Sequence, residues 1–469
     1  MGKILFELNE FEKYCYNFAV HGDLIVMISS IIENQSHNGN FDIELLKKAS
    51  IFLQERHPCL RSYVERENDR VFIKLHDKNY QDMIQIKWLD LTDQLVTRES
   101  LIPLAEKENS ELFNYSSDNL LWRLQIILFK EDSQTKCMLN FTMAFFTTDG
   151  FNMSTLAVEL VNILNSLLTN QKCLEMSERL EQIDGLYEYC EKNSLVKENN
   201  FKEIERRNHH PHSKFLLSEK LRANNESGFK LNFLKYDQES SSKMIKICKE
   251  NKVRLTSFFY TIGLYALKDL YDQNEIQFPK DVLIDIAASL RVRYNPVLNF
   301  SDTRTHVAII DFALNSDKFG SFTNFWQDAQ TLNKMVQEKT DINEGILFST
   351  THDLNGLREF NRIFLSEKSA HEILAEASDE THCDFAYSNL GSYINDNVNL
   401  VSGPLNITEV YCSDSLQSNP PMSIGIIHHI IFWKGQMMLQ FGANKSKISS
   451  VNMDRYIENY KNQMNKILC

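Results

Sequence analysis

The chain is poor in the two residues that interrupt regular structure, with 15 glycines and 8 prolines among 469 residues. Disordered and collagen-like chains are much richer in both, so this scarcity excludes those classes. The longest apolar run, at 23–32, is about ten residues, half of what a membrane-spanning helix needs. The N-terminus carries acidic side chains where a secretory signal needs an apolar segment. We therefore expect a cytoplasmic protein without a membrane span.

Closely spaced cysteines are also missing. The nine cysteines are scattered and form no C-x-x-C pair, which is typical of a reducing compartment where buried thiols act as small apolar side chains. The one run of histidines, His209, His210 and His212, has no cysteine or carboxylate at ligand spacing. A surface loop is therefore favoured over a metal site, and we expect no metal.

Basic residues are fewer than acidic ones: the chain has 50 lysines and arginines and 63 acidic residues, which gives a formal net charge of -13. Nonspecific affinity for phosphate comes from clustered Lys and Arg, so nucleic-acid binding is not expected. The remaining composition, 43% hydrophobic and 24% charged, is that of a globular protein. The length favours two domains.

Helical and strand patterns alternate along the chain, which favours an α/β or mixed α+β fold. Apolar residues at helical spacing predict helices at 42–56, 152–168, 240–252, 256–271 and 449–468. Apolar runs predict strands at 71–77, 121–129 and 136–146, and a strand that enters a polar turn within 282–293. A hairpin is predicted at 423–442, with its turn at Lys434 and Gly435.

One segment lacks a sustained apolar pattern. Residues 191–228 are polar and charged, and we interpret them as a linker. The linker divides the chain into an N-terminal domain, 1–190, and a C-terminal domain, 229–469. Both halves mix strands with helices.

Four short motifs follow one another along the chain. The first is RHPCLR at 56–61, and the second is AFFTTDG at 144–150, where a strand ends and a helix begins. SLRVR at 289–293 and YSNLG at 387–391 come later. In this order they resemble the chloramphenicol-acetyltransferase-like acyltransferases, which include alcohol acetyltransferases, polyketide-associated acyltransferases and condensation domains of nonribosomal peptide synthetases. The resemblance covers nearly the whole chain.

The resemblance implies a pseudo-dimer of two related mixed-sheet subdomains with a tunnel between them. An acyl donor, either a CoA or a carrier thioester, enters from one face and the acceptor from the other. The thioester is a co-substrate, and no bound cofactor is implied. The second histidine of the family motif, HHxxxDG, deprotonates the acceptor.

The two histidines of this motif correspond to Ala144 and Phe145, and neither side chain can accept a proton. Asp149 and Gly150 are retained, and the resemblance implies a structural ion pair between Asp149 and Arg291. The catalytic residue is thus unknown. A general base contributes roughly 10²- to 10⁴-fold, and an amine needs it less than a hydroxyl does because the amine already has a free lone pair.

The polar residues around the motif each have two interpretations. Asp149 is either a replacement base or the partner of Arg291, which would lower its pKa. Thr147 and Thr148 either donate to an oxyanion or bond the nearby backbone. Phe145 either blocks the tunnel or is an ordinary core aromatic.

The remaining candidates lie further along the chain. Ser289, Ser388 and Asn389 are tunnel-lining candidates by the resemblance, or strand ends with turn chemistry. Arg293 either meets a CoA phosphate or belongs to a structural clasp. His57 is expected to be a buried or helix-end histidine, while His428 and His429 must face opposite sides of a strand.

Two functions remain open. The chain is either a monomeric acyltransferase that acts on a small amine or alcohol without the usual base, or a catalytically inactive relative that binds a ligand or partner. Non-acyl chemistry in the tunnel is a further alternative.

Overall fold

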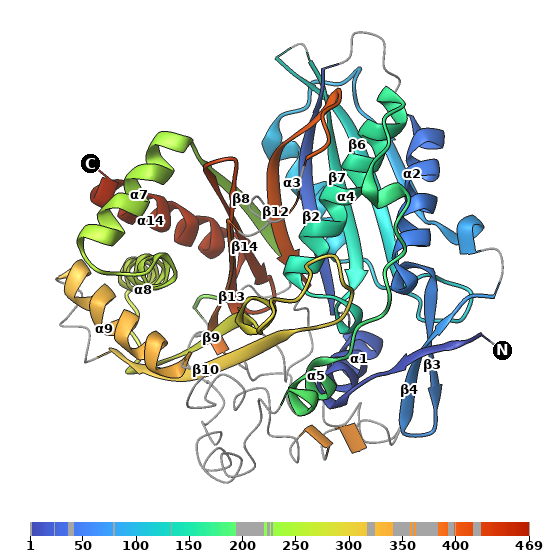
Figure 1. The fold of residues 1–469 in the computed structure, drawn as a ribbon. Helices are drawn as coiled ribbons and strands as arrows, with labels where there is room; N and C mark the ends of the chain where they lie inside the picture. Colours follow the sequence, from blue (N-terminus) through green and yellow to red (C-terminus); the bar gives the residue numbers. More distant parts are fainter. Residues whose placement is uncertain are drawn as a thin grey trace.

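The computed structural model describes residues 2–22, 24–35, 42–77, 80–132, 134–193, 220–222, 226, 228–316, 324–340, 357–358, 361–362, 383–392, 398, 400–415 and 424–468. Two lobes lie side by side, and in each lobe helices pack on a sheet (Figure 1).

The N-terminal lobe is built on a five-stranded sheet with the order β12-β2-β7-β6-β5. Its strands are β2 (Ile25–Asn34), β5 (Ile86–Asp90), β6 (Trp122–Glu131), β7 (Gln134–Ala144) and β12 (Leu405–Asp414). A small sheet adds β1 (Ile4–Glu7), β3 (Ser62–Glu67) and β4 (Arg70–Leu75). The helices are α1 (Glu10–Gly22), α2 (Ile43–Arg56), α3 (Arg98–Asn109) and α4 (Gly150–Thr169). Helix α5 (Leu186–Lys192) follows them in the chain, and its Leu186 and Cys190 are buried in the core of the C-terminal lobe.

The C-terminal lobe is built on a six-stranded sheet with the order β10-β9-β11-β13-β14-β8. Its strands are β8 (Phe229–Tyr236), β9 (Asp281–Ser289), β10 (Val307–Asn315), β11 (Cys383–Gly391), β13 (Ile424–Trp433) and β14 (Gln436–Asn444). Its helices are α7 (Gln238–Glu250), α8 (Leu255–Gln273), α9 (Phe325–Lys339) and α14 (Ser450–Leu468).

Strand β12 connects the two halves of the chain. It follows β11 in sequence, but it pairs antiparallel with β2, so that Val410 lies opposite Ser30. The C-terminal half therefore supplies the edge strand of the N-terminal sheet (Figure 1). The expected linker at 191–228 lies mostly outside the described residues, so the domain division stays a prediction.

Helix α4 is the central helix of the N-terminal lobe. It is long and apolar enough to cross a membrane by composition, but 89% of its apolar window is buried inside the protein. Its neighbours are α2, β2 and β12. The composition of α4 is thus explained by its place in the core.

Most of the predicted elements are present. The strand predicted to enter a polar turn within 282–293 is confirmed, because β9 ends at Ser289 and a 3₁₀ turn covers Arg291–Arg293. The hairpin turns where predicted, and Lys434 and Gly435 both have positive φ, 50° and 75°, as a tight β-hairpin turn requires. The apolar run at 23–32 forms most of β2.

Candidate functional site

The motif loop joins the end of β7 to the start of α4. After Ala144, a 3₁₀ turn covers Phe145–Thr147, and α4 begins at Gly150. Asp149 is the N-cap of α4, and its Oδ1 accepts a hydrogen bond of 3.0 Å from the backbone N–H of Asn152. Such a cap satisfies one of the free N–H groups at a helix start.

Asp149 also links the two lobes. Its Oδ2 accepts from Arg291 Nε at 2.8 Å and from the backbone N–H of His306 at 3.1 Å. The Arg291 side chain is fully buried, and its other nitrogens donate to the carbonyl oxygens of Asn299 and Arg304. Both carboxylate oxygens of Asp149 are therefore engaged in holding the fold, which favours the structural interpretation over a replacement base.

The two threonines of the motif are likewise bonded to their surroundings. Thr147 Oγ1 donates to the carbonyl oxygen of Ala144 at 2.8 Å, and Thr148 Oγ1 donates to Asn152 Oδ1 at 2.7 Å. Thr305, which lies outside the motif, also bonds the loop: its hydroxyl lies 3.0 Å from the carbonyl oxygens of Phe145 and Thr148. Both motif hydroxyls thus make local bonds of the kind expected in a turn.

Apolar side chains surround the positions where the family has its histidines. Ala144 is fully buried, and the Phe146 ring packs against Tyr16 at a centroid distance of 5.4 Å. Phe145 is partly buried against this cluster and against the core of the N-terminal lobe. Both halves of the chain contribute to the cluster, whose buried members include Ala144, Phe146, Phe229, Leu231, Ala386 and Ile427.

The other candidates lie on the C-terminal lobe. Asn389 Nδ2 donates to Thr256 Oγ1 at 3.0 Å, and its Oδ1 accepts from the backbone N–H of Gly391. The hydroxyl of Ser289 is buried without a hydrogen-bond partner among the described residues. Arg293 donates to the carbonyl oxygen of Thr340, as a structural clasp would. Tunnel-lining roles for Ser289, Ser388 and Asn389 stay predictions.

His57 is buried as expected and belongs to a charged cluster beside α4. Its Nε2 lies 2.5 Å from Glu159 Oε2, and Arg56 Nε lies 3.4 Å from the same oxygen. Ser301 donates to the other oxygen of Glu159. Burial raises the pKa of Glu159, but His57, Arg56 and Ser301 outweigh burial, so the pKa lies below its usual value.

The neighbouring histidines of β13 face opposite sides, as the strand alternation predicts. His428 points into the core of the C-terminal lobe, where its Nε2 lies 2.8 Å from the hydroxyl of Tyr456. Burial there lowers the pKa of His428 to about 3, because the charged form is poorly solvated.

His429 faces the N-terminal lobe. Its Nε2 lies 3.2 Å from Asp414 Oδ2 on β12, and its Nδ1 lies 2.6 Å from Gln440 Oε1 on β14. Ser388 is its partner in the register of the parallel strands β11 and β13. Sequence reasoning singled out His429 and Ser388 but missed Asp414 and Gln440, because their proximity depends on strand pairing.

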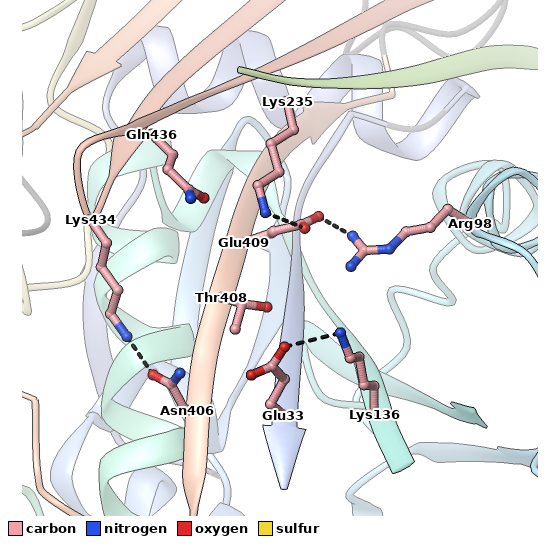
Figure 2. A pocket seen from close by; sticks show the side chains of 9 residues that line it. All are labelled: Glu33, Arg98, Lys136, Lys235, Asn406, Thr408, Glu409, Lys434 and Gln436. Carbon is pink, nitrogen blue, oxygen red and sulfur yellow. Dashed lines mark hydrogen bonds and ion pairs between the residues drawn. The ribbon is translucent and has the colours of Figure 1, made fainter. Parts of the chain in front are cut away.

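A charged cavity of about 230 Å³ lies between the lobes. Figure 2 shows the nine side chains that line it: Glu33, Arg98, Lys136, Lys235, Asn406, Thr408, Glu409, Lys434 and Gln436. Lys136 lies near the start of β7, whereas the motif follows its end. Most of the length of β7 therefore separates the cavity from the motif loop. None of the sequence motifs predicted this cavity.

Metal ligands do not gather in the described part of the chain, where no group of three or more His, Cys, Asp or Glu could hold an ion. The histidines at 209, 210 and 212 lie outside it. The eight cysteines within it are all buried free thiols.

Comparison with known proteins identifies the family. A sequence profile of the condensation domain matches residues 34–280, which is more than half of the 469 residues. The chain therefore belongs to the condensation domain family, as its motifs predicted. A comparison with curated protein sequences gives no significant match.

Solved structures agree with this assignment. Polyketide synthase associated protein 5 from Mycobacterium tuberculosis has a TM-score of 0.66 at 13% identity, with 100% of this chain and 99% of that one covered. TRI3 trichothecene 15-O-acetyltransferase from Fusarium sporotrichioides has a TM-score of 0.67 at 11% identity, covering 98% and 94%. The epimerization domain of tyrocidine synthetase B has 0.63 at 11%, covering 100% and 97%. At these identities the likeness shows the fold, and the predicted pseudo-dimer of mixed-sheet lobes is confirmed.

Proposed function

We propose that this protein is a binding member of the condensation domain family, which keeps the two-lobed scaffold but does not use the motif loop for acid–base chemistry. One observation carries the proposal. Ala144 and Phe145 offer no proton acceptor, while Thr147, Thr148 and Asp149 are all engaged in bonds that hold the loop and the lobes together. The retained half of the motif therefore has a structural role.

The packing around the motif supports the same proposal. A substrate that reached Phe145 would have to share the space with a cluster of buried apolar side chains drawn from both lobes. Interiors are packed nearly as densely as organic crystals, so such a cluster leaves little room without movement of its members.

The test is a turnover assay with acyl-CoAs and acyl-pantetheine thioesters, each combined with amine and alcohol acceptors, in which free thiol is followed. We expect no thiol release above the rate in buffer. Release that depends on both the enzyme and the acceptor would overturn the proposal.

A second function, acyl transfer to a small amine, is favoured by the His429 cluster. Asp414 holds this histidine in the way that a carboxylate orients a catalytic imidazole, and Ser388 is its neighbour on β11. A neutral amine needs a proton acceptor only after its attack on the thioester. His429 would take that proton on Nδ1 in the tautomer whose Nε2–H donates to Asp414, which requires the Gln440 amide to turn its oxygen away from Nδ1.

One substitution tests whether His429 carries the second function. If turnover is found, His429→Gln should lower it by roughly 10²-fold or more, the usual contribution of a general base. Gln330→Ala, a change on an exposed face of α9, serves as the control and should leave it unchanged. Turnover that survives His429→Gln would assign the reaction to another group.

A further inference from the structure

Helix α7 and the turn that follows it carry a run of basic side chains on the surface of the C-terminal lobe. Between positions 243 and 254 the chain has five cations and one carboxylate, Glu250, whereas the whole chain has a formal net charge of -13. The helix lies on the side of this lobe that is turned away from the N-terminal lobe (Figure 1). All five cations are exposed, and we call them the basic face of α7: Lys243, Lys246, Lys249, Lys252 and Arg254.

The opposite side of α7 is held by the core of the lobe. Met244 and Cys248 are buried in the hydrophobic cluster of the C-terminal lobe. The hydroxyl of Ser241 accepts from the backbone N–H of Met437 at 2.9 Å, which ties the helix to β14. Because these contacts hold the helix in one orientation, the basic face is a fixed feature of the surface.

The fold itself makes little use of these charges. Lys246 lies 3.9 Å from Glu250, but the two side chains are 77% and 59% exposed, and exposed pairs contribute little. Lys243 donates to a neutral acceptor, the carbonyl oxygen of Leu468. Within the described residues, the other three cations have no carboxylate partner: Lys249, Lys252 and Arg254.

The helix dipole accounts for only part of this pattern. Cations are favourable near the C-terminus of a helix, but the effect falls off within the last turn. Of the three lysines within α7, only Lys249 lies in that turn. Lys243 and Lys246 lie before it, where the dipole gives them little benefit. A carboxylate-bearing surface outside the molecule would account for all three lysines.

The spacing of the lysines matches the spacing of carboxylates on another helix. Successive lysines of α7 are three residues apart, which is about 4.5 Å along the helix axis. Acidic side chains on one face of a partner helix recur three or four residues apart, which is about 4.5–6 Å. Two helices that lie side by side thus bring several cations close to carboxylates at once.

Other anionic partners fit this surface less well. Nucleic-acid binding requires a field that neutralises many phosphates, and a chain with a net charge of -13 repels a long polyanion beyond this short face. An acidic helix carries its charge locally, so this repulsion is smaller. Helices that bind membranes insert large apolar side chains as well, and in the described part of the chain none of the exposed large apolar side chains lies on α7.

We propose that the basic face of α7 is a docking surface for an acidic helix of a partner protein, which it holds through exposed ion pairs. Such an interface is weak and sensitive to salt, because exposed charges are screened. No residue of α7 lines the charged cavity or belongs to the motif loop. Docking is therefore compatible with either function proposed above and can be tested independently of thioester turnover.

The experiment uses the full-length protein and the fluorescence anisotropy of labelled peptides. The probe is an alanine-based helical peptide with glutamates along one face, and the matched peptide has glutamine at the same positions. At about 20 mM salt, where surface charges are weakly screened, we expect saturable binding of the glutamate peptide. The glutamine peptide should bind at least about tenfold more weakly, since several ion pairs are lost.

The test variant neutralises three cations of the basic face, with Lys246→Gln, Lys249→Gln and Lys252→Gln in one protein. It should weaken binding of the glutamate peptide by about tenfold, because each exposed ion pair changes an equilibrium by about twofold. Thermal unfolding verifies that the variant is folded.

The matched control makes the same change in net charge on the N-terminal lobe, with Lys47→Gln, Lys48→Gln and Lys107→Gln on exposed positions of α2 and α3. It should change the affinity by less than about twofold, because distant surface charges are screened. A DNA duplex and phosphatidylserine vesicles are titrated in parallel. Failure of the glutamate peptide to bind at low salt, or equal affinity in the α7 variant and the parent, would overturn the proposal. Tighter binding of the duplex or the vesicles than of the peptide, lost in the α7 variant, would overturn it too and assign the surface to that partner.

Discussion

Asp149 and Arg291 are 142 positions apart in the chain, yet Arg291 Nε donates to Asp149 Oδ2 at 2.8 Å with both side chains buried. The pair fastens the motif loop of one lobe to the end of β9 in the other. The acidic residue of the family motif is thus engaged in a bond between the lobes, although the motif lacks its histidines.

Breaking this pair should strongly destabilise the protein. Asp149→Ala and Arg291→Ala should each lower the free energy of unfolding by about 3–5 kcal/mol, because each leaves a buried charge without its partner. The double variant should lose less than the sum of the two, since the second change removes the stranded charge. Urea denaturation of the three variants measures this coupling.

The control is Asp272→Ala, which breaks the exposed i,i+4 pair with Lys268 on α8. Exposed pairs of this kind contribute about 0.5 kcal/mol or less. If the Asp149 and Arg291 variants have the same free energy of unfolding as Asp272→Ala, the buried pair does not stabilise the fold as its geometry indicates.

Two glycines should respond differently to the same substitution. A Cβ on Gly263 of α8 would collide with the hydroxyl of Tyr387 and lie 3.0 Å from that of Tyr456. Gly263→Ala should therefore cost about 1–3 kcal/mol from overpacking, although alanine is the better helix former.

Gly150, the glycine of the motif, is the comparison. A Cβ there would lie 3.2 Å from Leu390 Cδ2, the end of a flexible side chain that can shift. Gly150→Ala should change the free energy of unfolding by less than about 1 kcal/mol, since helix propensity offsets the tight contact. A larger loss for Gly150→Ala than for Gly263→Ala in the same urea series would contradict this ranking.

The buried His428 should make the free energy of unfolding depend on pH in the acidic range. Its pKa is about 3 in the fold, against an ordinary value of 6.5. Between these values the unfolded chain binds a proton that the folded chain does not, so stability is fully present above about pH 6.5 and falls as the pH decreases toward 3. The slope from one proton is about 1.4 kcal/mol per pH unit.

This contribution can be measured as a difference between variants. His428→Phe should flatten the pH dependence of the unfolding free energy by up to that slope. Tyr456→Phe removes the same hydrogen bond, 2.8 Å long, but leaves the titrating group, so its slope should match the parent. Equal slopes in all three proteins would mean that His428 is protonated in the fold.

Local sequence patterns were sufficient to predict the helices whose apolar residues recur on one face. The helix predicted at 42–56 is α2, Ile43–Arg56, and that at 152–168 is α4, Gly150–Thr169. The place of β12 could not be predicted, because it depends on pairing with β2 from the other half of the chain. Nothing in the local pattern of β12 specifies that partner.

The candidate site divides in the same way. The pairing of Asp149 with Arg291 followed from two motifs that sequence comparison can align. The contact of His429 with Asp414 and the nine residues of the cavity depend on how strands from both halves meet at the interface between lobes. In the sequence alone nothing marks these polar residues as neighbours, because only the fold brings them together.

The last prediction concerns the position of the lost base. Phe145→His returns an imidazole to the place of the second motif histidine, and the smaller ring fits where a half-buried phenylalanine stands. If the apolar cluster from both lobes excludes substrates, this variant should release thiol from acyl-CoA and amine or alcohol mixtures no faster than Phe145→Gln, a variant of similar size without a base. Thermal unfolding of both variants verifies that they are folded. Acceptor-dependent turnover in Phe145→His alone, rising with pH through about 6.5 as the imidazole loses its proton, would show that the scaffold is competent and lacks only its base. That result would overturn the argument that the apolar cluster excludes substrates from the position of Phe145.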